Sequence, residues 1–503
     1  MEYCSQISIE TLFKKDSFVY MIGIKGTGMC AFAELLHYNK IRVCGSDTPD
    51  VFYTDAILKS LNIAYYEGFE PSNVPLNADL IIHSAAYTPE NNCEVAAALS
   101  LNTPLVKYTE ALGAYSALFD SAGVAGVHGK TTTTALCGVV AAALKLPAQI
   151  LAGSAVSNFG SGCNGARCTL FLGNEYFIAE TCEYRKHFLS FNPKRIILTS
   201  VESDHQDFFP TYNSIRDAFL EYVTKLTCND CEQKKEAMLI YCADDLGASE
   251  VAAMLKKTAA ADCAVRYVPY GFSADGDYKI TDYKTENEKA YFELAGFKQQ
   301  FSLRVSGRHN ALNATAALAL CAGIANEKNM LTQAHIKNAA AALDDFKGSK
   351  RRLEILGEAN GILFIDDYAH HPTAIKTTLA GLKDFYPQRR IVVSFMPHTY
   401  TRTHALLDEF ASAFTYADVL VLHKIYSSAR ETAIPGISGE TLFKKTEKIF
   451  LQNNKNAVYY FAEPCDADVM LKSFLQSKDL FITMGAGDNW KLGKLLYDEM
   501  RQK

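Results

Sequence analysis

Apolar and polar residues follow one another in this chain as short apolar runs separated by longer helical patterns. In the first part, strand-like runs at 18–24, 40–47 and 78–87 are separated by stretches such as 29–40, where apolar residues recur at helical spacing. Short apolar runs that alternate with helical patterns are typical of a parallel sheet covered by helices. This part is therefore predicted to be an α/β domain.

Two further blocks repeat the pattern. The second has strand-like runs at 175–181 and 195–205 and an alanine-rich helical stretch at 310–325. The third repeats the strand–helix rhythm at 362–382, 390–410, 417–426 and 479–490. Between about 225 and 300 the chain is more polar and richer in turn residues, so we expect either an insertion or a small antiparallel element there. The predicted domains are 1–112, 113–347 and 348–503.

Composition supports a globular protein of several domains. The chain has 503 residues, of which 49% are hydrophobic and 21% charged, as in ordinary soluble proteins. Lysine and arginine number 50 against 56 acidic residues, which gives a net charge of -6. Since nucleic-acid binding depends on basic surfaces, we expect no nucleic-acid partner.

The sequence also bears on location. It has no uncharged apolar run of about 18 residues, so no membrane span is expected. Its N-terminus lacks the basic and apolar regions of a signal peptide. The fourteen cysteines lie mostly in apolar runs, which favours reduced thiols in a cytoplasm. Cys228 and Cys231 are expected to be loop cysteines, because a zinc site would need two further ligands at suitable spacing.

The first glycine-rich turn follows the apolar run at 18–24. Gly26, Gly28 and Ala31 match a loose dinucleotide fingerprint, and Asp47 follows about twenty residues later, where an acid would meet a ribose hydroxyl. This pattern is compatible with a nicotinamide site, with another nucleotide diphosphate, or with a plain tight turn.

The second glycine-rich turn has a stronger signature. Gly123, Gly126 and Gly129 lead into Lys130 and Thr131 and then a helical pattern. Such a loop curls its backbone N–H groups around phosphates, the lysine adds a point charge, and the threonine hydroxyl reaches Mg²⁺. A strict Walker loop has a glycine where Val124 stands, so the spacing is a variant. A chance Gly-Lys-Thr turn is the alternative.

Acidic residues and a histidine end the next strands of this block. Glu180 ends one strand, and Asp204 and His205 follow another. Because strand C-terminal ends face the ligand crevice in open α/β sheets, Thr131, Glu180 and His205 are predicted to converge on Mg²⁺. The alternative is that the neighbouring acids, Glu183, Asp204 and Asp207, merely cap loops.

The third block has two more polar clusters after strands. One contains Asp366, Asp367, Tyr368, His370 and His371, followed by Pro372 at a helix start, and the other contains His398 and Arg402. Arg402 is suited to clamp a carboxylate or phosphate. Taken singly, each of these residues has the alternative of being an ordinary polar residue of a surface loop.

Taken in order along nearly the whole chain, these motifs resemble the Mur ligase family. The matching stretches are IGIKGTGM…GSD, GVHGKTTTT, CEYRKHFLSFNP…DHQDFF, SGRHNALNATAA, DDYAHHPT, PHTYTRT and GAGDNW. The resemblance implies a Rossmann-like N-terminal domain that binds a UDP substrate, a central P-loop ATPase domain, and a Rossmann-like C-terminal domain.

The resemblance also implies a reaction. The γ-phosphate of ATP, with Mg²⁺ or Mn²⁺, would activate the carboxylate of UDP-N-acetylmuramate as an acyl phosphate, and L-alanine would then attack it. Such an enzyme would serve peptidoglycan synthesis in the cytoplasm as a monomer or weak homodimer. A recycling ligase that joins a tripeptide to the same sugar nucleotide is the near alternative. An NAD-dependent dehydrogenase and a P-loop switch are alternatives from other classes.

The family's residue roles transfer by motif. Lys130, His205, His370 and Arg402 are the expected catalytic residues, and Thr131, Glu180 and His205 the expected metal ligands. The residues expected around ATP are Gly126, His128, Gly129, Lys130, Thr131, Thr132, His309, Asn310, Asn313, Asp366 and Tyr368. Those expected to hold the UDP substrate are Gly26, Thr27, Gly28, Met29, Ser46, Asp47 and Ser84, and His398 is expected to face the amino acid and the acyl phosphate.

This chain departs from the family pattern at several positions. Val127 replaces a usual threonine and Thr399 a usual arginine, whose anionic contact Arg402 or Lys376 would have to supply. Lys25 replaces a usual glycine, and we expect it either to contact a phosphate or to be exposed. No lysine occurs between His205 and Lys225, and Leu220 lies near the place where some relatives carry a carbamylated lysine. We therefore predict no carbamylation.

Overall fold

The computed structural model describes residues 9–160, 165–227, 237–258, 265–427, 431–453 and 457–502. These form two compact units. The first comprises Met1–Val201, Arg216–Lys279 and Asn313–Ala342, and the second comprises Glu202–Ile215, Ile280–Leu312 and Leu343–Lys503. The Cys228 and Cys231 pair lies outside the described residues.

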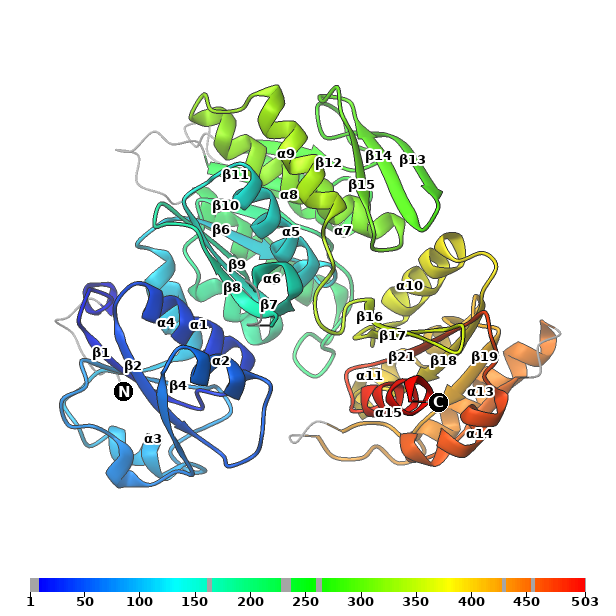
Figure 1. Ribbon diagram of the computed structural model, residues 1–503. Coiled ribbons are helices and arrows are strands. Elements are labelled where there is room, and N and C mark those ends of the chain that lie inside the picture. Colours follow the sequence, from blue (N-terminus) through cyan, green and yellow to red (C-terminus); the bar gives the residue numbers. More distant parts are fainter. Residues whose placement is uncertain are drawn as a thin grey trace. The chain divides into compact units, whose positions relative to one another are not determined.

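The first unit begins with a five-stranded parallel sheet of order β3-β2-β1-β4-β5 (Figure 1). Its strands are β1 (Phe18–Ile22), β2 (Arg42–Asp47), β3 (Ala64–Glu67), β4 (Leu80–His83) and β5 (Leu105–Lys107). The accompanying helices are α1 (Thr27–Tyr38), α2 (Thr54–Ser60), α3 (Cys93–Ala98) and α4 (Tyr108–Ser116). Strand β1 is the central strand of this order, and its residues from Val19 to Ile22 are fully buried, as expected for a parallel strand between two others.

A second sheet of the same unit has seven strands in the order β12-β11-β10-β6-β9-β7-β8. All pairings are parallel except β7 with β8. The strands are β6 (Asp120–Ala125), β7 (Ala148–Val156), β8 (Arg167–Phe171), β9 (Tyr176–Glu180), β10 (Arg195–Leu198), β11 (Ala237–Cys242) and β12 (Val265–Tyr270). The helices that fall wholly or mainly in this unit are α5 (Lys130–Ala143), α6 (Tyr212–Thr224), α7 (Leu246–Thr258), α8 (Arg308–Glu327) and α9 (Gln333–Asp344).

The second unit contains a small antiparallel sheet and a larger mixed sheet. The small sheet is β13 (Ile280–Glu286), β14 (Lys289–Leu294) and β15 (Gln300–Leu303). It confirms the predicted antiparallel element for the end of the polar region only, since β11, α7 and β12 of that region belong to the first unit. The larger sheet has the order β16-β17-β21-β18-β19-β20, parallel except for β16 with β17. Its strands are β16 (Glu354–Ala359), β17 (Ile362–Asp367), β18 (Arg390–Phe395), β19 (Val419–Leu422), β20 (Val458–Tyr460) and β21 (Asp479–Met484).

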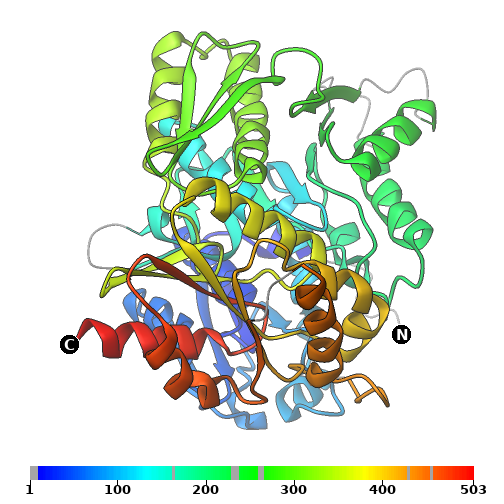
Figure 2. The same cartoon turned by 90° about the vertical axis from the view of Figure 1, so that its right-hand side faces the viewer.

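Helices cover both faces of the six-stranded sheet (Figure 2). They are α10 (Pro372–Phe385), α11 (Tyr400–Ala405), α12 (Leu407–Ser412), α13 (Gly439–Gln452), α14 (Asp468–Phe474) and α15 (Trp490–Arg501). Leu363 and Ile365 of β17 pack in one cluster with α10, α12 and α13, whereas Phe364 packs in another with α14 and α15. Because successive strand residues point to opposite faces, a nearly continuous apolar run such as ILFI serves both.

These parallel sheets with helices confirm the predicted α/β class. Among the helices of the described residues, none combines the length and apolarity that a membrane crossing requires.

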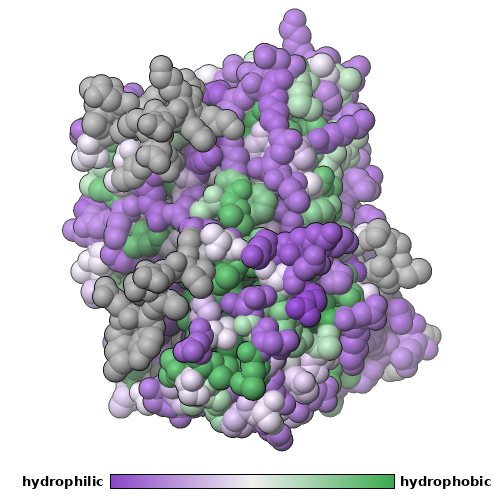
Figure 3. Space-filling model, turned by 90° about the vertical axis from the view of Figure 1, so that its left-hand side faces the viewer, coloured by the Kyte–Doolittle hydropathy of each residue, from purple (hydrophilic) through white to green (hydrophobic). Residues whose placement is uncertain are grey.

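On the face drawn in Figure 3, hydrophobic residues form patches separated by hydrophilic ones. The nine cysteines in the described part of the chain are free thiols.

Candidate functional site

The phosphate loop connects β6 to α5 in the first unit. Gly126 has φ of 139° and Gly129 has φ of 80°, values that favour glycine. A Cβ on Gly126 would lie 2.0 Å from the Thr199 hydroxyl oxygen, and one on Gly129 would lie 2.6 Å from Asn313 Oδ1. Both glycines are therefore required by backbone conformation and by close approach. Asn313, which the sequence predicted to contact the nucleotide, lies beside this loop.

The loop is held by the segment that follows β10, because β6 and β10 are neighbours in the sheet. The Val127 N–H donates to the Ser200 carbonyl at 3.0 Å, and the His128 N–H donates to the Ser200 hydroxyl at 2.9 Å. The Thr199 hydroxyl donates to the His128 carbonyl at 2.5 Å. These bonds fix the loop and occupy two backbone donors of its centre.

Lys130 is the first residue of α5, and its ammonium is engaged inside the unit. It donates to the Gly126 carbonyl, to the Val127 carbonyl at 3.4 Å and to the Glu183 carboxylate at 2.8 Å. Burial opposes the charge on Lys130, but the carboxylate of Glu183 raises the pKa of the lysine above its ordinary value. The Glu183 side chain is 3% exposed. The sequence suggested only a loop cap for Glu183 and did not predict its pairing with Lys130.

The predicted metal ligands divide between the units. Thr131 is buried at the start of α5, and Thr132 beside it is half-buried. Glu180 ends β9, which pairs with β6, and its carboxylate accepts the Gly153 N–H at 2.9 Å. His205 lies in the second unit with φ of 53°. The convergence of Thr131, Glu180 and His205 on one metal stays a prediction.

In the second unit, the structure brings together His370, His398 and Arg402. The rings of His370 and His398 meet edge to face with centroids 5.8 Å apart, and Arg402 Nη1 donates to His398 Nδ1 at 3.3 Å. Burial, reinforced by Arg402, lowers the pKa of His398 to about 4 and holds the pKa of His370 well below its usual value. Both rings are therefore neutral at pH 7, and Arg402 carries the positive charge of this group.

Arg402 is paired with Asp204, a residue that the sequence analysis left between a functional role and a loop cap. Arg402 Nε and Nη2 donate to Asp204 Oδ1 at 3.0 and 2.9 Å, and both side chains are almost completely buried. Burial opposes ionisation of Asp204, but Arg402 holds the pKa of that carboxyl far below its usual range. The pair fixes the guanidinium in one orientation.

A second carboxylate organises the same region. Glu431 accepts the N–H groups of Tyr400 and Thr401 at 2.7 Å each and the Thr401 hydroxyl at 2.6 Å. Thr399, which precedes α11, has φ of 68°, an unusual value for a β-branched residue. Glu431 could not be predicted from the sequence, since no local motif links it to α11.

The two acids at the end of β17 have separate roles. Asp366 pairs with Arg351 at 3.1 Å and accepts the Thr483 hydroxyl at 2.6 Å. Asp367 accepts the Leu353 and Ala369 N–H groups, and burial raises its pKa to about 6. The ring of Tyr368, a predicted nucleotide contact, lies under two guanidinium groups, those of Arg351 and Arg352.

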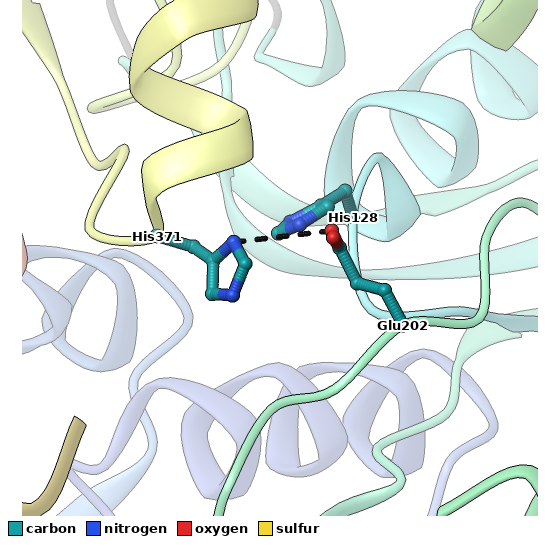
Figure 4. Close-up of side chains that lie close together, drawn as sticks. All are labelled: His128, Glu202 and His371. Atoms are coloured by element: carbon teal, nitrogen blue, oxygen red, sulfur yellow. Dashed lines mark ion pairs between the residues drawn. The ribbon is translucent and has the colours of Figure 1, made fainter. Parts of the chain in front are cut away.

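Further contacts place the remaining residues of this unit. His371 caps α10 and lies 3.9 Å from the Glu202 carboxylate, toward which it is turned in Figure 4. His128, also drawn there, belongs to the first unit. His309 and Asn310 open α8, and the Asn310 amide donates to the Ser306 carbonyl at 2.7 Å. They belong to the second unit, whereas Asn313 belongs to the first.

The first glycine turn leads directly into α1, which starts at Thr27. Gly28 faces the Tyr108 ring, Met29 is buried, and Ser84 accepts the Ala86 N–H at 3.3 Å. Gly26 has an ordinary negative φ of -56°.

Two predicted substrate residues of β2 are buried and internally bonded. Asp47 accepts the Lys25 N–H at 2.6 Å, and the Ser46 hydroxyl donates to Glu94. Lys25 is 1% exposed, so the expectation of an exposed side chain is wrong. Its charge is neutralised inside the fold by Asp55, 3.3 Å away.

Comparisons with known proteins give a consistent result. Three family models match: Mur ligase family, catalytic domain, over residues 18–120; Mur ligase middle domain over 124–321; and Mur ligase, glutamate ligase domain, over 351–487. A UDP-N-acetylmuramate–L-alanine ligase of Treponema pallidum is 46% identical over 486 residues, covering 96% of this chain and 97% of the relative.

Solved structures share the fold. UDP-N-acetylmuramate-alanine ligase MurC from Thermotoga maritima aligns with a TM-score of 0.73 at 22% identity, covering 96% of this chain and 99% of that one. A murein peptide ligase from Psychrobacter arcticus aligns with a TM-score of 0.63 at 22% identity, covering 97% and 99%.

Proposed function

Because this chain belongs to the Mur ligase family, we propose that it is an ATP-dependent ligase that joins L-alanine to UDP-N-acetylmuramate in peptidoglycan synthesis. The observation that carries this proposal is the 46% identity, over 96% of the chain, to a relative of that name. The phosphate loop and the buried Arg402 group give the proposal a chemical basis.

The phosphate loop fits a nucleoside triphosphate. Its two glycines have positive φ and no room for a side chain, Lys130 provides a cation, and α5 presents its N-terminus to the loop. Lys130 would move from Glu183 to the transferred phosphoryl group, where its charge matters most in the transition state. Asn313, beside Gly129, would border the nucleotide.

The donors around the loop also fit Mg²⁺, which prefers hard oxygen ligands. The carboxylate of Glu180 ends the strand next to β6, and Gly153 lets its backbone approach that carboxylate, since a Cβ there would lie 2.3 Å from Glu180 Oε2. Thr131 and Glu180 would hold the ion with His205. Bound Mg²⁺ would neutralise charge on the phosphates.

The proposed chemistry proceeds in two steps. The carboxylate of UDP-N-acetylmuramate attacks the γ-phosphorus of ATP, ADP leaves, and an acyl phosphate forms. The amine of L-alanine then adds to the acyl carbon, loses a proton, and inorganic phosphate leaves as the amide forms. Arg402 would bind the alanine carboxylate, with the neutral rings of His370 and His398 beside it. These groups act by alignment and charge neutralisation.

The recycling ligase that accepts a tripeptide is the second candidate, since a murein peptide ligase shares the fold. The test is ADP release with ATP, Mg²⁺ and UDP-N-acetylmuramate, with L-alanine in one reaction and tripeptide in the other. Release that depends on alanine supports the proposal. Release only with tripeptide supports the recycling ligase, and turnover of ATP alone would contradict both.

Three subsidiary proposals accompany this function. We propose domains at 1–112, 113–347 and 348–503, which the three matched family segments support. We propose a cytoplasmic location, in line with the cysteine usage. A monomer or weak homodimer is the proposed assembly.

A further inference from the structure

Lys25 is a buried lysine in the first glycine turn. Its side chain is 1% exposed, and its ammonium donates to the Thr48 carbonyl at 2.9 Å and to the Asp50 carbonyl at 3.1 Å. Its third partner is Asp55 Oδ1 at 3.3 Å. An ammonium group has three donors, and these three oxygens are close to it, while a Glu67 carboxylate oxygen lies farther away at 4.0 Å. Burying such a charge is unfavourable unless these bonds form, so their geometry is strongly specified.

All three partners lie in or beside the segment Thr48–Tyr53, which connects β2 to α2. Asp55 extends the network, since it accepts the Phe52 N–H at 2.6 Å and the Tyr65 hydroxyl at 2.6 Å. Thus Lys25 holds the start of the segment through carbonyl groups, and Asp55 holds its end through a backbone N–H.

The backbone of Lys25 makes the same connection. Its N–H donates to Asp47 Oδ2 at 2.6 Å, and its carbonyl accepts the Thr54 hydroxyl at 2.6 Å. At the segment's end, the Tyr53 hydroxyl donates to the Thr27 hydroxyl at 3.0 Å. The segment Thr48–Tyr53 is therefore attached to the glycine turn at both ends.

Between these attachments the segment presents apolar side chains to solvent. Val51 is 93% exposed, Phe52 42% and Tyr53 52%. Exposed apolar side chains grouped beside a polar ligand candidate, here Thr27, which Tyr53 contacts, are a feature of binding surfaces. These contacts order the loop in the folded protein. The entropy cost of ordering it is therefore not subtracted from the free energy of ligand binding.

We infer that Lys25 is a positioning residue for the sugar-nucleotide substrate, because it keeps Thr48–Tyr53 beside the glycine turn in the conformation that receives the UDP moiety. This inference rests on the proposed function. It assigns Lys25 no contact with a phosphate, since its ammonium is already engaged by Thr48, Asp50 and Asp55.

The test compares Lys25→Met with Lys59→Met, a control at an exposed lysine of α2. ADP release is measured with each of the three substrates varied in turn, and binding of UDP-N-acetylmuramate to the free enzyme is measured by calorimetry. We expect Lys25→Met to raise KM and Kd for UDP-N-acetylmuramate about tenfold, the effect of losing a preorganised loop. Its kcat and its KM for ATP and alanine should stay within about twofold, and the control should match wild type.

A second variant covers the case in which Lys25→Met fails to fold. Tyr65→Phe removes one bond to Asp55 and leaves the charge pair intact, and it should raise the same KM by a smaller factor. An unchanged KM in the folded variants, or an equal loss for all three substrates, would overturn the inference. Wild-type enzyme that binds UDP-N-acetylmuramate without alanine-dependent turnover would refute the proposed function alone, and equal binding by Lys25→Met would refute only the role of Lys25.

Discussion

Removal of the Arg402 guanidinium tests the chemistry of the second unit most directly. In the Arg402→Ala variant, the alanine carboxylate loses a charge-assisted partner, which is worth about 1.5–3 kcal/mol. The negative charge of Asp204 then remains uncompensated and repels that carboxylate by about 1–2 kcal/mol. Together these terms predict that kcat/KM for alanine falls by about two to four orders of magnitude.

A separate effect concerns folding. The buried pair is broken by removal of one partner, and both side chains are only 5–6% exposed, so unfolding should become easier by about 3–5 kcal/mol. This penalty is present with and without alanine, so it changes the thermal midpoint rather than the alanine dependence. The two effects are therefore measured separately.

The assay is ADP release as a function of alanine at saturating ATP and UDP-N-acetylmuramate, with the thermal midpoint recorded for each variant. Adding Asp204→Asn to Arg402→Ala removes the repulsive charge and should recover about tenfold in kcat/KM for alanine. Asp408→Asn, at a side chain 80% exposed, is the matched control. Normal alanine saturation by Arg402→Ala would refute the proposed role, and a double variant no better than the single one would refute the repulsion.

Three further predictions concern other sites. Lys130→Ala should nearly abolish alanine-dependent ADP release, because the charge on the transferred phosphoryl group loses its cation; unchanged kcat would remove Lys130 from the mechanism. Gly126→Ala should abolish ADP binding measured by calorimetry, since the new Cβ would lie 2.0 Å from the Thr199 hydroxyl oxygen, and wild-type affinity would show that the loop adapts. Burial lowers the pKa of His423 from 6.5 to about 4. The neutral ring therefore makes its full contribution to the free energy of unfolding above pH 6.5, and this contribution should decline by about 3 kcal/mol as the pH falls toward 4. His423→Gln should flatten the decrease of the thermal midpoint over that range, and an unaltered slope would contradict this.

The sequence predicted which segments form helices and strands better than it predicted which strands lie next to one another in a sheet. The apolar runs and helical patterns indicated the α/β class because they reflect local periodicity. The order of the seven-stranded sheet, with β6 between β10 and β9, carries no comparable local signal. The phosphate loop was predictable because glycine conformation and Lys130 lie within one short motif.

Partners distant in sequence were harder to predict. Glu183 lies 53 residues from Lys130, and Asp204 lies 198 residues from Arg402. Each acid was noticed beside a predicted ligand but could be interpreted as a loop cap, since only the folded chain brings the opposite charge to it. Lys25 shows the same limit, because its burial depends on Asp55 and the carbonyl groups of a later segment.

The resting contacts of Lys130 have a consequence for ligand discrimination. Its ammonium already has the Gly126 and Val127 carbonyls and the Glu183 carboxylate as partners. What Lys130 adds to nucleotide affinity is therefore a difference: the free energy of its interaction with the phosphates minus that of its interaction with Glu183. A ligand with a single phosphate would replace Glu183 with little net gain, whereas a triphosphate brings more charge than one carboxylate. We therefore expect the affinity of the site for adenine nucleotides to increase with their number of phosphates. The Glu183 carboxylate, which competes for Lys130, should make binding of a nucleotide with one phosphate weak.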